Sequence, residues 1–187
     1  MPDLKSAKQH GLYDPAYEHD ACGVGMVLHM KGVKSHAIVE NGLRVLENMT
    51  HRGAENADNK TGDGAGIMLQ IPHEFILLQG IPVPEKGHYG TGLVFLPKGE
   101  AEAESCMITL TQYVEKENLK RLAVRDVPVN SDILGEMALL NEPSIKQIFI
   151  VGDEEMTQDE LEHRLYLLRK KIEREIFNSK IFSLETK

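Results

Sequence analysis

The run from Cys22 to Met30 constrains the fold of this chain more than any other stretch. Apolar side chains recur along it with a period of two, which predicts a buried strand over residues 22–30. The residues that share this face are Val24, Met26, Leu28 and Met30. Gly23 and Gly25 leave the opposite face bare, so we expect a ligand or another part of the backbone to approach closely there.

Cys22 stands at the head of this strand, after about twenty polar residues that show no periodic apolar face. If the chain is cut after Ala21, a thiol and a free α-amine lie on the same residue. An α-amine has a pKa of about 7.7–8, so it can accept the proton of the thiol near neutral pH. Cys22 would then be both nucleophile and general base. The alternative is a structural role, because unpaired cysteines are often small buried hydrophobic residues.

Length, net charge and the content of cysteine and histidine limit the classes of protein to which this chain can belong. The 187 residues suffice for one domain with a core, and the net charge of −8 argues against nonspecific nucleic-acid binding. The sequence shows neither a secretory signal nor an apolar run of membrane-spanning length, so we expect no membrane partner. Two cysteines in such a chain favour the cytoplasm. The eight histidines are scattered without ligand spacing, which argues against a metal-binding protein.

A helix is predicted to follow the first strand. Ser35 is a suitable N-cap, and apolar residues at helical spacing carry the pattern to about Asn48. Arg52 lies just beyond, where a guanidinium beside a cysteine strand would keep the thiolate region electropositive. The alternative is a solvated surface arginine. His51 is interpreted as structural, without a part in proton transfer.

The rest of the chain predicts alternating strands and helices. The glycine-rich segment 61–66 lacks the features of a phosphate-binding loop and predicts a tight turn into a strand. Strands are expected over 66–71, 91–96, 119–127, 147–151 and from 180, and helices over 75–78, 100–117, 133–140 and 157–177. Cys106 lies at the edge of an apolar stripe and is predicted to be a packed thiol. This order predicts a layered α/β (α+β) arrangement.

Four segments together resemble the start of the large subunit of glutamate synthases. They are Tyr13–Pro15 (YDP), Glu18–Gly25 (EHDACGVG), Leu46–Ala54 (LENMTHRGA) and Ala57–Ile67 (ADNKTGDGAGI). The resemblance is specific in order and spacing, and it covers roughly residues 12–75. In that family, this region is a class II glutamine amidotransferase domain of the N-terminal-nucleophile hydrolase type.

The resemblance implies a four-layer αββα sandwich, incomplete at its C-terminus, with residues 1–21 as a leader and 22–187 as the N-terminal part of the domain. It implies that Cys22 is the catalytic nucleophile and that Arg52 and Gly23 support the nucleophile or bind substrate. The implied reaction is hydrolysis of glutamine to glutamate and ammonia through a Cys22 thioester. The ammonia is destined for 2-oxoglutarate, as part of glutamate biosynthesis and nitrogen assimilation.

The implied partners are glutamine and the remaining domains or subunits of a glutamate synthase. Its oxidoreductase chemistry uses FMN and an iron–sulfur cluster, which the resemblance assigns to later domains and not to this chain. The oxyanion-hole asparagine–glycine pair, a second arginine motif and the acid that holds the α-amino group of the substrate find no match before Lys187.

Loss of one oxyanion donor costs roughly 100- to 1000-fold in rate, so we expect this chain alone to be weakly active or inactive. The alternative function is a catalytically incomplete interaction or structural module. A cysteine–histidine hydrolase, with a histidine beside Cys22 in space, also stays open.

Overall fold

The computed structural model describes residues 23–53, 58, 60–62 and 64–178. The predictions for the leader 1–21, for Cys22 itself and for the strand from residue 180 lie outside these residues. The chain divides into two compact units, one of residues 1–69 with 133–139 and one of residues 70–132 with 140–187.

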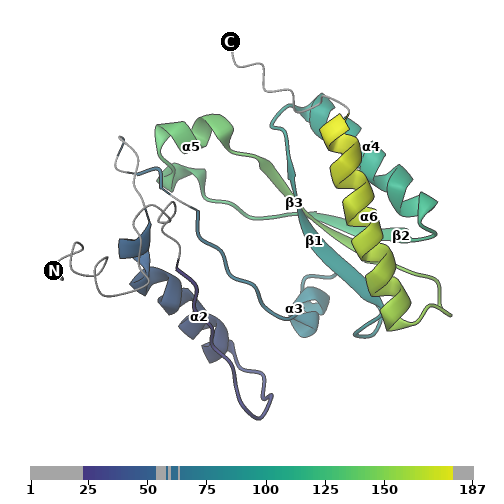
Figure 1. Ribbon diagram of the computed structural model, residues 1–187, viewed down its shortest axis with the longest axis horizontal. Helices are drawn as coiled ribbons and strands as arrows, with labels where there is room; N and C mark the ends of the chain where they lie inside the picture. The colour runs from purple at the N-terminus through teal and green to yellow at the C-terminus, as the bar shows by residue number, and fades with distance from the viewer. Residues whose placement is uncertain (1–22, 54–57, 59, 63, 179–187) are drawn as a thin grey trace, which may run out of the picture. The chain divides into compact units, whose positions relative to one another are not determined.

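The second unit is built on a three-stranded antiparallel sheet (Figure 1). Its strands are β1 (Tyr89–Leu96), β2 (Lys120–Asp126) and β3 (Ser144–Val151), in the order β1-β3-β2. Phe149 of the central strand pairs with Thr91 on one side and with Ala123 on the other. The register of β2 shifts between Arg121 and Ala123, where the strand carries an irregularity.

Two long helices, α4 (Glu100–Lys116) and α6 (Gln158–Asn178), pack together and cover one face of this sheet (Figure 1). Their apolar stripes meet Ile148 and Ile150 of β3. The buried members of this core are Leu110, Val114, Leu119, Ile148, Ile150, Met156, Leu161 and Leu168. Cys106 is buried at 8% exposure, as predicted for a packed thiol.

A smaller cluster lies on the opposite face of the sheet, because Phe149 alternates with Ile148 and Ile150 along β3. The short helix α3 (His73–Leu78) and the segment after it supply its other members, which are Ile76, Ile81, Val83 and Tyr89. Phe149 itself is 0% exposed. Towards the other end of β1, Phe95 on this same face is 58% exposed.

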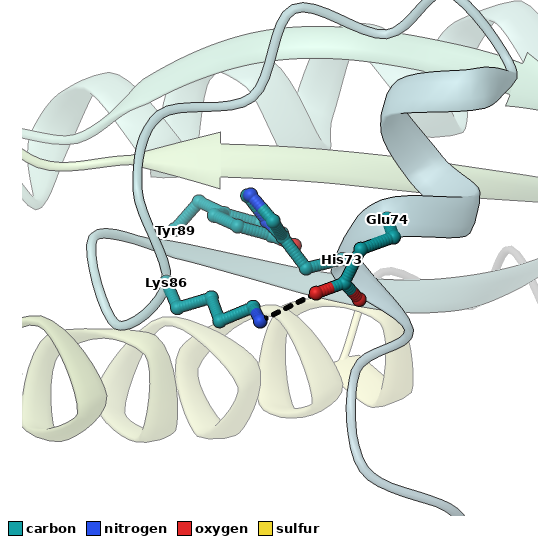
Figure 2. A network of polar contacts seen from close by, with 4 residues as sticks. All are labelled: His73, Glu74, Lys86 and Tyr89. Carbon is teal, nitrogen blue, oxygen red and sulfur yellow. Dashed lines mark hydrogen bonds and ion pairs between the residues drawn. The ribbon is translucent and has the colours of Figure 1, made fainter. Parts of the chain in front are cut away.

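Polar contacts fasten α3 to the start of β1 (Figure 2). The Nδ1 atom of His73 lies 3.0 Å from the hydroxyl oxygen of Tyr89, and the two rings are tilted by 36° with centroids 5.7 Å apart. Beside them, the ammonium of Lys86 donates to Glu74 Oε1 at 2.7 Å. Burial raises the pKa of the Tyr89 hydroxyl, so this group stays protonated and available for the contact.

Most of the predicted elements of this unit are confirmed, with ends that differ by a few residues. The strands 91–96, 119–127 and 147–151 correspond to β1, β2 and β3. Helix α6 begins with the capping box that the sequence predicts, since Glu160 N–H donates to Thr157 Oγ1 at 3.3 Å and the carboxylate of Glu160 accepts from the Thr157 N–H at 3.3 Å. Where the sequence predicts a helix over 133–140, most of which belongs to the first unit, the structure has a 3-10 turn, Ser131–Ile133, and α5 (Glu136–Asn141).

The first unit contains α2 (His36–Asn48), which continues into the 3-10 turn η2 (Thr50–Arg52). Ser35 caps α2 as predicted, because its hydroxyl oxygen accepts from the Ala37 N–H at 3.1 Å.

Two strand predictions in this unit are wrong for the described residues. Residues 23–29 and 66–71 form no strand, and the apolar face of the first segment is exposed, with Val24 at 91% and Met26 at 82%. The alternation is present, but no strand in the described part of the chain pairs with either segment, and an extended segment becomes a strand only when a neighbour completes its hydrogen bonds.

The fold class is therefore mixed α/β, with an antiparallel sheet. The described residues form one three-stranded sheet and not two stacked sheets. No helix in the described part of the chain is both long and apolar enough to span a bilayer.

Candidate functional site

The candidate site begins with the corner that follows α2. The chain does not leave the helix abruptly after Asn48, because local hydrogen bonds tighten it into the 3-10 turn Thr50–Arg52. Thr50 Oγ1 donates to the Glu47 carbonyl at 2.7 Å, and the Arg52 N–H donates to the Met49 carbonyl at 2.8 Å. These bonds set the position of Arg52 relative to the end of α2.

His51 is held by the same corner. Its Nδ1 atom lies 2.9 Å from the Asn48 carbonyl oxygen. A carbonyl oxygen can only accept, so Nδ1 carries the proton in this contact. This contact supports the interpretation of His51 as a structural residue that closes the end of α2.

The segment that contains Gly23 and Gly25 lies along α2. A Cβ atom built on Gly23 would lie 2.7 Å from Met49 Sδ and 3.6 Å from Arg52 Cγ. A Cβ atom on Gly25 would overlap Val45 Cγ1. The structure thus brings together two of the residues that the sequence singles out, Gly23 and Arg52, although many residues separate them along the chain.

The glycine face of this segment is therefore occupied. The sequence predicts a close approach of a ligand or of another part of the backbone, and the structure shows the side chains of Val45, in α2, and Met49, its C-cap residue, in that space. Cys22 lies outside the described residues, but it is bonded directly to Gly23, so the backbone next to the candidate nucleophile packs against the helix that leads to Arg52.

Asp58 is a charged residue of this unit to which the sequence alone assigns no role. Its carboxylate accepts from the Thr61 hydroxyl at 2.5 Å and from the backbone N–H groups of Thr61 and Lys60 at 2.8 and 3.1 Å. These bonds, led by the one from the Thr61 hydroxyl, lower the pKa of Asp58 to about 2. A Cβ on Gly135 would overlap both Asp58 and Thr61, so this turn packs tightly against the residues before α5.

The chemistry of Asp58 follows from these contacts. A carboxylate with a pKa of about 2 is an anion at neutral pH and holds no proton to donate. We therefore interpret Asp58 as the residue that fixes the turn at 58–61, not as a general acid. A short aspartate–threonine spacing next to glycines is the signal in the sequence that indicates such a turn.

A shallow hollow of about 430 Å³ lies in the second unit, between the end of α4 and the start of α6. Its lining residues are Glu117, Asp159, Glu160, His163, Arg164 and Leu167. Several of its polar groups already have partners, since Arg164 donates to the Glu117 carbonyl at 2.9 Å and Lys171 pairs with the Glu117 carboxylate. Glu160 is engaged in the capping box of α6. These contacts serve the packing of α6 on α4.

The described residues show no grouping of three or more histidine, cysteine, aspartate or glutamate side chains that would hold a metal ion. The network of His73, Glu74, Lys86 and Tyr89 in Figure 2 likewise consists of mutual contacts that hold α3. Among the described residues, the candidate site is therefore the region around Gly23, Met49 and Arg52, where two residues singled out by the sequence, Gly23 and Arg52, lie close together.

Comparison with known proteins gives a consistent result. Residues 22–185 match the family described as class II glutamine amidotransferases. The chain is 45% identical over 176 residues to a glutamate synthase [NADH] of Saccharomyces cerevisiae and 43% identical over 173 residues to one of Schizosaccharomyces pombe. These matches cover 87% of this chain and 8% of each relative.

A bacterial relative shows the same relationship. The glutamate synthase [NADPH] large chain of Bacillus subtilis is 39% identical over 169 residues, which cover 89% of this chain and 11% of that protein. The chain thus spans about a tenth of the length of these relatives.

Proposed function

The chain belongs to the class II glutamine amidotransferases, and from this premise we propose that it is the N-terminal part of the glutaminase domain of a glutamate synthase. The observation that carries the proposal is the location of Arg52 beside Gly23, in a chain whose family match begins at Cys22. Gly23 is bonded to Cys22, so this arrangement supports a role near the nucleophile for Arg52, a permanent cation from a separate segment.

Cys22 is the nucleophile of the proposed reaction, exposed as the N-terminal residue by removal of residues 1–21. Its α-amine accepts the thiol proton, and the thiolate sulfur forms a bond to the side-chain amide carbon of glutamine. The carbon–nitrogen bond then breaks, and the nitrogen leaves as ammonia after taking up a proton. Water attacks the resulting glutamyl thioester, which releases glutamate and restores the thiol.

Arg52 contributes positive charge near the nucleophile. A guanidinium keeps its charge at any pH at which the enzyme works, and charge of this sign favours a thiolate over a thiol. The glycine at position 23 has a steric role in this scheme, since a side chain there would collide with Met49. Arg52 and Gly23 are thus assigned to supporting the nucleophile, with Cys22 as the catalytic residue.

The wider assignment rests on the relatives. We propose that the ammonia passes to 2-oxoglutarate in the remaining domains or subunits of a glutamate synthase, where FMN and an iron–sulfur cluster supply the redox chemistry, in the cytoplasm. We further propose the four-layer αββα sandwich as the fold of the complete domain. The exposed apolar residues of 24–30 and the exposed Phe95 on the open face of the sheet support further layers of structure in that assembly.

The experiment that tests the proposal is the intact mass of the purified chain before and after exposure to a diazo-ketone analogue of glutamine. We expect loss of residues 1–21 and one adduct on Cys22. The matched controls are Cys22→Ala, which should abolish the adduct, and Cys106→Ala, which should leave it unchanged because Cys106 is buried in α4.

A full-length mass without an adduct would contradict the proposal for this chain and favour the non-catalytic interaction module. An adduct on Cys22 with residues 1–21 still attached would contradict the role of the α-amine and favour a separate base, such as a histidine. Release of glutamate from glutamine, measured on the same samples, separates a labelled but inactive chain from a working glutaminase.

A further inference from the structure

Met49 touches both parts of the candidate site. Its thioether sulfur lies 2.7 Å and its Cγ 3.5 Å from the point that a Cβ on Gly23 would occupy. Its backbone carbonyl accepts the Arg52 N–H at 2.8 Å. One residue therefore contacts the backbone next to the candidate nucleophile with its side chain and the backbone of the candidate cation with its main chain.

The contact at Gly23 is one of a matched pair. Met49, the C-cap residue of α2, comes four positions after Val45, a rise of about 6 Å along the helix axis. Gly25 comes two positions after Gly23, a rise of about 6.6 Å in an extended chain. The two rises agree, so Val45 packs on Gly25 and Met49 packs on Gly23. These two contacts fix the position of the segment along the axis of α2.

Resting on the proposed function, we propose that Met49 is a positioning residue for the Cys22 nucleophile. Its side chain fixes the distance of the Gly23 backbone from α2, and its carbonyl fixes the start of the turn that carries Arg52. A shift of either contact moves the Gly23 backbone, to which Cys22 is bonded, relative to the turn that carries Arg52. A misplacement of about 1 Å can cost on the order of 100-fold in rate, so a close contact of this kind has a measurable effect.

Methionine suits this position because its side chain is unbranched and flexible, so it can adjust its conformation to pack over a glycine. Leucine has similar volume and should largely preserve the contact, whereas alanine removes it. A Cβ at position 23 can be accommodated only if the side chain at position 49 retreats. The two positions should therefore be coupled in a double-mutant cycle.

The test uses the 187-residue chain and two labelling reactions of Cys22, with the diazo-ketone glutamine analogue and with iodoacetamide. The variants are Gly23→Ala, Met49→Ala, the double variant and Met49→Leu. Gly66→Ala is the matched control, because a Cβ there meets nothing within 4 Å. Rates are measured well below the melting temperature of every variant, so a change in rate does not report loss of folded protein.

We expect Gly23→Ala to slow both reactions about ten-fold or more, and Met49→Ala to slow them about three-fold, with Met49→Leu and Gly66→Ala within about two-fold of the unaltered chain. In the double variant, the loss caused by Gly23→Ala should be largely recovered. A double variant whose losses simply multiply, or a set of single variants all within two-fold, would overturn the proposal.

Iodoacetamide alkylates a thiol without recognition of glutamine. The two reagents therefore test the positioning role of Met49 separately from the proposed glutaminase function. Coupling seen with iodoacetamide but no labelling by the glutamine analogue would refute the proposed function and retain the positioning role. Labelling by the analogue without coupling would refute the positioning role alone. If Gly23→Ala does not fold, the comparison of Met49→Ala with Met49→Leu decides the matter, and equal rates for the two would overturn the proposal.

Discussion

Truncation of Phe149 to alanine should destabilise the second unit far more than the same change at Phe95. Phe149 is 0% exposed on the central strand and packs with Ile76 and Tyr89 on one face of the sheet. A buried Phe→Ala change costs about 3–5 kcal/mol, from lost transfer energy and from the cavity that remains.

Phe95 provides the matched comparison, because it lies on the same face of the same sheet but is 58% exposed. Burying a large apolar side chain completely is worth about 1.5–3 kcal/mol, and about two fifths of Phe95 is buried, so its truncation should cost about 1 kcal/mol. The structure therefore predicts a difference of about 2–4 kcal/mol between two chemically identical substitutions.

The assay is thermal and urea unfolding followed by circular dichroism. For a chain of this size, 1 kcal/mol corresponds to about 2–4 °C in the melting temperature, so Phe149→Ala should lower it by about 6–20 °C and Phe95→Ala by about 2–4 °C. Equal shifts for the two variants would refute the packing of Phe149 between the sheet and α3. A larger shift for Phe95→Ala would show that its side chain, not that of Phe149, is the buried one.

Three further predictions concern the helix cap, the acidic turn and the second thiol. Ser35→Ala removes the cap of α2 and should cost about 1 kcal/mol in thermal unfolding, whereas Ser35→Asp should not. The pKa of Asp58 falls from 3.8 to about 2 on folding, so its bonds with Thr61 stabilise the fold above pH 4, and the difference in melting temperature between the unaltered chain and Asp58→Asn should vanish as the pH falls from 4 to 2. Burial raises the pKa of the Cys106 thiol, so iodoacetamide should alkylate it at least about ten-fold more slowly in the native chain than in urea at pH 8; equal rates would show that the thiol is accessible.

The sequence predicts the second unit well because its elements carry their own signals. Helix α6 begins at a capping box, and the apolar stripe that starts at Leu161 follows the helical period. The strand at Ser144–Val151 is a short apolar run that ends at a glycine, and it becomes the centre of the sheet. What the sequence does not provide is the strand order β1-β3-β2, since local patterns contain no information on which strands pair.

The first unit shows the opposite case. The alternation of apolar residues at 24–30 indicates which side chains share a face. It does not indicate whether a second strand lies alongside to complete the hydrogen bonds. In the structure the apolar face is exposed where a buried face was expected, and the close approach at the glycine face comes from side chains, not from a ligand or backbone. The location of Arg52 beside Gly23 brings together two of the segments that carry the family resemblance, and the roles of the two residues stay predictions. Helical periodicity does not single out Met49, because it does not reveal which segment of the chain crosses a helix.

The packing of Val45 and Met49 over the two glycines changes the interpretation of these glycines. A bare face suggests space for a substrate, yet Val45 and Met49 occupy that space, so glutamine cannot lie over residues 23–25 on this side while α2 stays in place. Because Gly23 and Gly25 have no side chains, α2 can pack close to this segment. This packing brings the turn that contains Arg52 close to the backbone of Gly23, the residue after Cys22. The proposed reactivity of Cys22 then depends on helix packing, and a substitution on α2 that never touches substrate should alter the rate at which Cys22 is labelled.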